Sequence, residues 1–279
     1  MFPSLLAWTF QGRGLQSGGD TDLNVFTDCG VEADPSSDEW DNLDTEDMGD
    51  PLMVSEHVAE IFSYMKSIEV SFTIILSPLH LSNYYQQVIM LNPLYIDTQN
   101  ELTWTIHSIL IDWTIQVHLD FHLLPETLFL AINIIDCFLS ACTVSLAKLQ
   151  LVGITCLFIT SKVEEIMSPS ITHFLNCVDS SYTENEILQV EQYVLNTLEW
   201  NLSYPNPIHF LQRLSNADKY NVKARTIAKY LVEITCLEWR LLSTPPSLLA
   251  ATVIWLLCLI LDDETWVCLC FVQIICVFT

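Results

Sequence analysis

Three histidines that could bind a metal ion lie close together in the sequence: His107, His118 and His122. Imidazole is a common metal ligand, and His118 and His122 have the i, i+4 spacing that places two side chains on one helix face. The apolar residues around them indicate that a helix ends here, and no HExxH motif is present. We therefore interpret these histidines as core or surface residues and predict no metal site.

Glu164 and Glu165 are adjacent carboxylates, and paired carboxylates can act as acid and base in catalysis. Adjacent residues point to different faces of a helix, so a solvated helix end is the better interpretation. No Ser/His/Asp or Cys/His arrangement stands out, and neither GxxxxGK[ST] nor GxGxxG occurs. The sequence therefore indicates no catalytic residues and no phosphate-binding loop.

Lys162 is a rare base at the end of a long apolar run, in the stretch FITSKVEEIMSPS. No other Lys or Arg lies between Lys66 and Lys148 or between Lys162 and Arg213. The whole chain has 10 Lys+Arg against 34 Asp+Glu, a formal net charge of -24. Such a chain repels nucleic acid, because binding nucleic acid relies on basic residues at phosphates. A neutral or basic protein partner is favoured.

The composition indicates a folded chain in a reducing compartment. Of its 279 residues, 51% are hydrophobic, and the ten cysteines are scattered in apolar runs without paired CxxC spacing. Reduced cysteines acting as small hydrophobes are the expected state. The apolar run 248–261 is shorter than the roughly 20 residues of a membrane span, so we predict a buried helix. Membrane association through the C-terminal apolar runs is the alternative.

Apolar periodicity predicts an all-α protein in which strand signals are weak. The run 146–162 is apolar on every side, which is typical of a buried central helix. Ser168 and Pro169 predict an N-cap followed by proline at the first helical position, and Thr183 with Glu186 forms a capping-box pattern. The other predicted helices are 101–119, 125–139, 207–214, 221–237 and 246–261.

Three long stretches carry a resemblance to a known family: LPETLFLAINIIDCFLS (124–140), KLQLVGITCLFITSKVEEIMSP (148–169) and YTENEILQVEQYVLNTLEWNLSYPNP (182–207). They resemble the cyclin box of B-type mitotic cyclins, most closely the fungal ones. The resemblance implies a cyclin fold, with one complete five-helix box followed by a second, apparently truncated one. The expected divisions are an acidic disordered tail 1–49, an N-terminal helix 50–69, an atypical insert 70–91, the first box 92–203, a partial second box 204–266 and an atypical apolar tail 267–279.

The resemblance also implies a function. Cyclins are not enzymes and need no cofactor; they bind and activate a cyclin-dependent kinase with a PSTAIRE helix, here for the G2/M transition in the nucleus and cytoplasm. The family's kinase-contacting lysine matches Lys162 and its partner glutamate matches Glu191, and we also assign Glu165 and Phe158 to this contact. The simpler alternative is that Lys162 only caps its own helix.

A second site implied by the resemblance is a hydrophobic patch that docks Arg-x-Leu substrates or inhibitors. The family motif Met-Arg-x-Ile-Leu-x-Asp-Trp matches residues 106–113. Plain core packing is the alternative, because the apolar members have helical spacing. The family has an acid at position 116, where this chain has glutamine. The predicted patch consists of Ile106, Ile109, Leu110, Trp113, Gln116, Leu149 and Gln150.

One departure from the family concerns a buried pair. The family's arginine in the docking motif is replaced by His107, and its aspartate partner matches Asp136. Neutral His107 is expected to leave this buried carboxylate poorly paired, at a cost of about 3–5 kcal/mol. His107→Arg is therefore expected to stabilise the fold.

Two segments, 70–87 and 267–279, have no counterpart in the family that we recognise. Both begin with valine, whose codons start with GT as introns do, and we hypothesise that both are translated introns. The second box would then lack helices that cover the apolar helix 247–261, which predicts an exposed apolar face. A truncated or mis-spliced cyclin with impaired kinase activation is therefore the alternative function.

Overall fold

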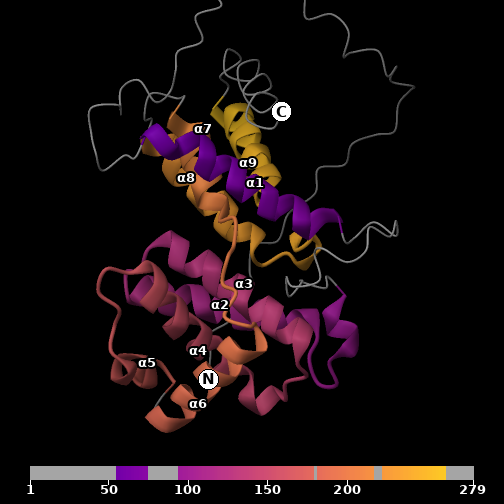
Figure 1. Ribbon diagram of the computed structural model, residues 1–279, viewed down its shortest axis with the longest axis vertical. Helices are drawn as coiled ribbons and strands as arrows, with labels where there is room; N and C mark the ends of the chain where they lie inside the picture. The colour runs from indigo at the N-terminus through magenta and orange to yellow at the C-terminus, as the bar shows by residue number, and fades with distance from the viewer. Residues whose placement is uncertain (1–54, 75–93, 179–180, 217–221, 262–279) are drawn as a thin grey trace, which may run out of the picture. The chain divides into compact units, whose positions relative to one another are not determined.

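The computed structural model describes residues 55–74, 94–178, 181–216 and 222–261, and the regular elements in these ranges are all helices (Figure 1). This confirms the predicted all-α class. The acidic tail 1–49, most of the segment 70–91 and the tail 267–279 lie outside the described residues. The α-helices are α1 (Val58–Ile74), α2 (Trp104–Asp120), α3 (Pro125–Ala141), α4 (Leu146–Glu164), α5 (Ile171–Cys177), α6 (Glu184–Thr197), α7 (Pro207–Asn216), α8 (Val222–Thr235) and α9 (Pro246–Leu261), and the 3-10 turns are η2 (Ser55–His57), η3 (Tyr95–Thr98) and η4 (Trp239–Leu241).

The first bundle, which consists of α2 to α6, is built around α4. Every residue of α4 from Leu151 to Ser161 is buried, as the all-round apolar pattern predicts. By length and composition α4 is the one helix among the described residues that could cross a membrane, but 67% of it is buried inside the protein. The apolar character of α4 is therefore accounted for by the helices packed around it.

Local sequence signals explain most helix starts in this bundle. Thr183 accepts from the backbone N–H of Glu186 while the Glu186 side chain accepts from that of Thr183, so the predicted capping box is confirmed. Pro125 opens α3 as expected. The predicted N-cap at Ser168 is wrong: α5 begins at Ile171 after Ser170, and the Ser168 hydroxyl lies 2.8 Å from that of Ser161.

The second bundle consists of α7, α8 and α9, and helix α1 packs against it. The Phe62 ring of α1 contacts the Phe210 ring of α7 edge to face at 5.7 Å, and the Arg213 guanidinium lies 5.6 Å from the centre of the Phe62 ring. Met65 is buried in the same core. In Figure 1, α1 lies across the helices of this bundle, although it precedes the first bundle in the sequence. Helix α1 therefore contributes side chains to the core of the second bundle.

Helix α9 has one buried and one exposed apolar face. Ala250, Ile254 and Leu257 are buried in the core of the second bundle, whereas Trp255 and Leu259 are exposed. The expected exposed apolar face is thus present within the described residues. Residues after 261 lie outside them, and so does the predicted truncation of the second box.

A carboxylate of α1 holds the start of α9. Glu69 is 4% exposed; its Oε1 accepts from the backbone N–H of Ser247 at 2.6 Å and its Oε2 from the Ser247 hydroxyl at 2.6 Å. Lys66 Nζ lies 3.6 Å from the same carboxylate. A carboxylate at a helix N-terminus satisfies free N–H groups and interacts favourably with the helix dipole. Glu69 therefore ties the N-terminal helix to the second bundle.

We predict that Glu69→Ala lowers the free energy of unfolding by about 1–3 kcal/mol, because it leaves the Ser247 N–H and hydroxyl without this acceptor in a buried place. Glu60→Ala on the exposed side of α1 is the matched control and should change stability by no more than about 0.5 kcal/mol. Denaturant unfolding followed by circular dichroism measures both. Equal effects of the two variants would contradict this role of Glu69.

Candidate partner-binding surface

The predicted pair of Lys162 and Glu191 is present. Lys162 lies in the last turn of α4, Glu191 lies on α6, and their side chains form an ion pair. The Lys162 side chain is 41% exposed and that of Glu191 is 11% exposed, so the carboxylate is held inside while the ammonium reaches the surface. Lysine at a helix C-terminus is also favoured by the helix dipole. The pair presents a positive group in a region where the sequence has few.

Phe158 lies beneath this lysine. It is 8% exposed, and Lys162 Nζ lies 4.2 Å from the centre of its ring. The ring also packs edge to face against Phe174 of α5 at 5.4 Å. A cation over an aromatic face is attracted by the ring quadrupole. Phe158 therefore positions the ammonium of Lys162, from a place that is almost wholly within the core.

Glu165, the next predicted contact residue, is engaged within the chain. Its Oε1 accepts from the backbone N–H of Leu124 at 2.7 Å and from the Thr127 hydroxyl at 2.6 Å, both at the start of α3. Its neighbour Glu164 is also half-buried, and this burial raises the pKa of the Glu164 carboxyl. The two glutamates are therefore not a solvated helix end as expected, because Glu165 caps a neighbouring helix.

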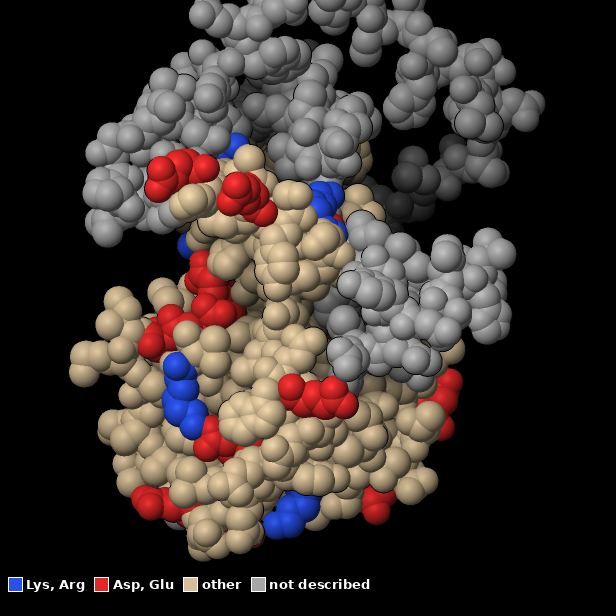
Figure 2. Space-filling model, viewed as in Figure 1, with Lys and Arg blue, Asp and Glu red and all other residues tan. Residues whose placement is uncertain are grey.

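Sequence reasoning missed three exposed apolar residues beside Lys162. Val163, in the last turn of α4, is 53% exposed, and in the turn that follows α4 Met167 is 87% exposed and Ile166 is fully exposed. The signal was present in the sequence, because these residues follow the long apolar run of α4, at the point where Lys162 and two glutamates indicate that the chain reaches the surface. Figure 2 shows one face of the molecule, where single acidic and basic groups stand among larger uncharged areas. Exposed apolar side chains around a single cation are typical of a protein-binding surface.

The structure divides the predicted docking patch into surface and core. Ile109, Gln116 and Gln150 are exposed, and Ile106 and Trp113 are half-buried. Leu110 and Leu149 are each 5% exposed and belong to the core of the first bundle. The core-packing alternative therefore holds for these two leucines, while the other members remain accessible.

A glycine lets α2 lie close to α4 beneath this patch. A Cβ on Gly153 of α4 would lie 2.8 Å from Leu110 Cδ1, closer than real Cβ contacts. The absence of a side chain at position 153 thus allows Leu110 to fill the space between the helices. On the outer side of α2, the Gln116 side chain donates to Asp112 Oδ2 at 2.8 Å. An acidic group is therefore present one helical turn before the position where the family has its acid.

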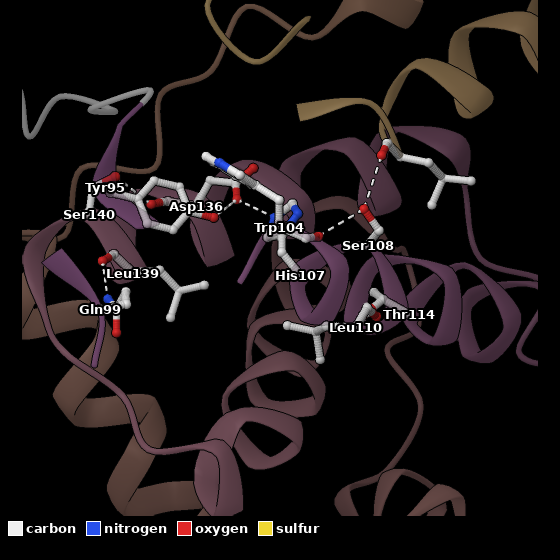
Figure 3. A network of polar contacts seen from close by, with 11 residues as sticks. Tyr95, Gln99, Trp104, His107, Ser108, Leu110, Thr114, Asp136, Leu139 and Ser140 are labelled. Carbon is white, nitrogen blue, oxygen red and sulfur yellow. Dashed lines mark hydrogen bonds and ion pairs between the residues drawn. The ribbon is translucent and has the colours of Figure 1, made fainter. Parts of the chain in front are cut away.

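Asp136 of α3 lies at the centre of a buried polar network (Figure 3). The Tyr95 hydroxyl donates to its Oδ1 at 2.8 Å, and His107 Nε2 lies 2.7 Å from the same oxygen. His107 and Asp136 are 3% and 1% exposed. The contact between His107 and Asp136 that the sequence predicts is present, and the Tyr95 hydroxyl is a second donor to the carboxylate that the sequence did not reveal. Burial and the negative charge of Asp136 both raise the pKa of Tyr95.

A buried glutamine fixes the segment that carries Tyr95. The Gln99 side chain donates to the carbonyls of Leu139 and Cys142, each at 2.7 Å, and accepts from the N–H of Val144 at 2.9 Å. These bonds hold η3 against the end of α3, which places Tyr95 beside Asp136. The sequence signals for this network are weak, because each partner is distant along the chain.

His118 and His122, the other two histidines considered as metal ligands, contact the backbone. His118 Nε2 donates to the Leu124 carbonyl at 2.9 Å, and His122 Nδ1 donates to the Leu119 carbonyl at 2.7 Å, at the end of α2. Within the described ranges no three His, Cys, Asp or Glu side chains gather as metal ligands would. Both histidines thus bond to backbone carbonyls where α2 ends, and the sequence predicted a helix end at this place.

Comparison with known families agrees with this architecture. The family model "Cyclin, N-terminal domain" matches residues 80–203, and "Cyclin, C-terminal domain" matches residues 205–270. The chain belongs to the cyclin family. The first match begins inside the segment 70–91, and the second extends past residue 266. This cyclin's two matched domains correspond to the first and second bundles.

Several fungal proteins are similar to this cyclin. The G2/mitotic-specific cyclin cdc13 of Schizosaccharomyces pombe is 50% identical over 83% of this chain and 45% of its own length. The G2/mitotic-specific cyclin-B of Emericella nidulans is 44% identical over 92% of this chain and 49% of its own. The G2/mitotic-specific cyclin-2 of Saccharomyces cerevisiae is 44% identical over 82% of this chain and 43% of its own length. The chain spans about half the length of these relatives.

A solved structure supports the fold. A viral cyclin from herpesvirus saimiri superposes with a TM-score of 0.61 at 19% identity, covering 73% of this chain and 83% of that chain. The cyclin fold predicted from the sequence is therefore confirmed.

We predict that Tyr95→Phe lowers the free energy of unfolding by about 1.5–3 kcal/mol, because it removes a hydrogen bond to a buried carboxylate. Tyr64→Phe is the control, since Tyr64 is 60% exposed, and it should stay within about 0.5 kcal/mol of the unmodified protein. Urea denaturation of the three proteins makes the comparison. Unchanged stability of Tyr95→Phe would show that Asp136 does not depend on the tyrosine.

Proposed function

We propose that this cyclin is the regulatory subunit that binds and activates a cyclin-dependent protein kinase of the PSTAIRE type and so controls the G2/M transition. The observation that carries the proposal is the Lys162–Glu191 pair, which lies at the positions that match the family's kinase contact. The three fungal relatives, each named as a G2/mitotic-specific cyclin, support the phase of the cell cycle. In this proposal the kinase supplies the catalytic residues and the cyclin supplies none.

The geometry of the pair suits recognition of a kinase backbone. The ammonium group has three N–H donors, and Glu191 accepts from one of them in the described part of the chain. The remaining donors are free to bind carbonyl oxygens of a partner. Ile166 and Met167 supply apolar surface beside them, and each fully buried side chain of this kind contributes about 1.5–3 kcal/mol.

Activation follows from where such a contact would act. A protein kinase transfers phosphate only when a Lys–Glu ion pair of its own is assembled, and the position of its PSTAIRE helix decides this. A rigid surface that binds this helix in its active position shifts the kinase towards the active state. The buried helix α4 is such a rigid support, because Lys162 directly follows its buried stretch.

The location that we propose is the nucleus and cytoplasm. Five of the ten cysteines are free thiols in the described part of the chain, which suits a reducing compartment: Cys137, Cys142, Cys156, Cys177 and Cys236. Burial raises the pKa of Cys137 to about 12, so this thiol stays protonated and unreactive. Fluorescent tagging of the chain at its natural expression level tests the location.

The kinase contact is tested by a pair of lysine variants. Lys162 and Lys148 both lie on α4 and both pair with a glutamate of α6, and Lys148 pairs with Glu186 at 3.2 Å in a more exposed place. Lys162→Ala is expected to weaken binding of a PSTAIRE-containing kinase by about 2 kcal/mol or more, roughly 30-fold in Kd. Lys148→Ala should leave binding within about twofold.

Co-purification and a histone kinase assay give the two readouts. Binding that Lys162→Ala and Lys148→Ala reduce equally would overturn the assignment of Lys162. A chain that binds the kinase without activating it would favour the alternative of a truncated or mis-spliced cyclin. A chain that neither binds nor activates any PSTAIRE-type kinase would overturn the proposed function.

A docking role for the α2 surface is a second proposal, for Arg-x-Leu segments of substrates or inhibitors. Ile109 is 64% exposed beside half-buried Trp113, which suits the leucine of such a segment. Asp112, held by Gln116, offers a carboxylate for the arginine.

We expect Ile109→Ala to weaken binding of an Arg-x-Leu peptide about tenfold, because an exposed apolar anchor is lost. Leu119→Ala, at an equally helical and 54% exposed position of α2, should leave peptide binding unchanged. Fluorescence anisotropy with a labelled peptide measures both, and kinase activation on histone should not respond to either. A peptide that binds all three proteins equally would contradict the docking role.

A further inference from the structure

The second bundle carries a charge opposite to that of the chain as a whole. Residues 205–261 contain six Lys and Arg against three Asp and Glu, whereas the whole chain has a net charge of -24. A basic surface in an otherwise acidic chain attracts negatively charged groups. Four of the six bases, which we call the basic end of the second bundle, lie in the last turn of α7 and in α8: Arg213, Lys223, Arg225 and Lys229.

The basic end is directed away from the first bundle. Pro207 and Pro246, the first residues of α7 and α9, line a cavity together with Thr235, the last residue of α8. Asp136 and Phe129 of the first bundle line the same cavity, so these three helix ends face the first bundle. The end of α7 and the start of α8 therefore lie on the far side of the second bundle, where the basic end begins.

Two lysines of the basic end have no partner within the described ranges. Lys223 and Lys229 are exposed, and neither forms a hydrogen bond or an ion pair there. The acids at the start of the neighbouring α1 are engaged elsewhere, because Glu56 and Glu60 each lie 3.6 Å from a ring nitrogen of His57. The charge of the two lysines is therefore available to carboxylates from outside the described residues.

Helix α1 begins at the basic end. Near its start, Phe62 packs against Phe210 of α7 and lies 5.6 Å from the Arg213 guanidinium. Near its end, Glu69 bonds to Ser247 at the start of α9, on the side that faces the first bundle. The helix therefore runs from the basic end towards the first bundle, and the chain that precedes it leaves the described residues at the basic end.

An acidic segment directly precedes α1. The stretch DTEDMGD (44–50) lies outside the described residues and contains four acids and no base. Four residues separate it from Ser55, where the described chain begins, and an extended chain covers about 3.3–3.6 Å per residue. A tether this short gives the segment a local concentration on the order of millimolar at the basic end. Its carboxylates are therefore within reach of the two lysines: Asp44, Glu46, Asp47 and Asp50.

We propose that segment 44–50 of this chain binds the basic end of the second bundle, where its carboxylates pair with Lys223 and Lys229. Charge complementarity and the place of the segment directly before α1 single out this occupant. The contact covers a positive surface that would otherwise attract acidic segments of other proteins, and it fastens the start of α1 to the second bundle. It is separate from the proposed kinase contact, because Lys162 and Glu191 belong to the first bundle.

Carbodiimide cross-linking of the full chain tests this contact directly. The reagent joins carboxylate and lysine side chains that touch, and mass spectrometry of the digest identifies them. Links from segment 44–50 to Lys223 or Lys229 are expected, and the pair of Lys148 and Glu186, 3.2 Å apart, is the internal control. A control link without any link from the segment would overturn the proposal. In a mixture of ¹⁴N and ¹⁵N chains the links should stay within one chain; links between two chains would make a second copy the occupant and overturn it as well.

Two double variants give a second readout. Lys223→Gln with Lys229→Gln removes two charges of the basic end, and a glutamate-specific protease should then cut after Glu46 about tenfold faster, because a bound segment is protected from cleavage. Lys148→Gln with Arg240→Gln removes the same charge from exposed places outside the basic end and should keep the rate within about twofold. Equal cleavage rates in the two double variants would overturn the proposal. All four substitutions change exposed side chains, and the cross-links of the unmodified chain decide independently of them.

Discussion

The burial of the middle of α4, from Leu151 to Ser161, is the constraint on which the rest of this structure depends. A helix whose residues are buried on every side between Leu151 and Ser161 needs a layer of helices around it, and its few buried hydroxyls must find partners within the protein. Its hydroxyls at Thr155 and Ser161 return to backbone carbonyls of the same helix. Charged side chains of α4 therefore lie only near its two ends, and Lys162 of the proposed partner contact reaches the surface at the C-terminal one.

The sequence predicted the features that depend on neighbours along the chain. Helix periods, the capping box at Thr183 and the central position of α4 follow from local patterns, and α9 has the predicted bounds. The pairing of Lys162 with Glu191 was also predicted, because the resemblance to the cyclin family assigned both positions.

The features that the sequence could not predict depend on distant partners. The hydrogen bonds of Glu165 to the start of α3, which lies far from it in sequence, had no local signal. The second donor to Asp136 comes from Tyr95, a residue with no local pattern to mark it. The start of α5 was wrong by two residues, because the Ser168 hydroxyl contacts Ser161 instead of starting a helix. Side-chain hydrogen bonds of this kind have no period, and so they appear only in the folded chain.

The contact between Trp104 and Trp239 has a consequence for observing this molecule. The two indole rings stack at 5.0 Å with an angle of 11° between them, one at the start of α2 and the other in the turn before α9. The Ser108 hydroxyl fixes the same region by donating to the Leu237 carbonyl at 3.2 Å. Two chromophores at this separation couple their electronic transitions, so their combined optical spectrum depends on how the two bundles meet. A change in the near-UV circular dichroism of this tryptophan pair would therefore report a movement of one cyclin box against the other.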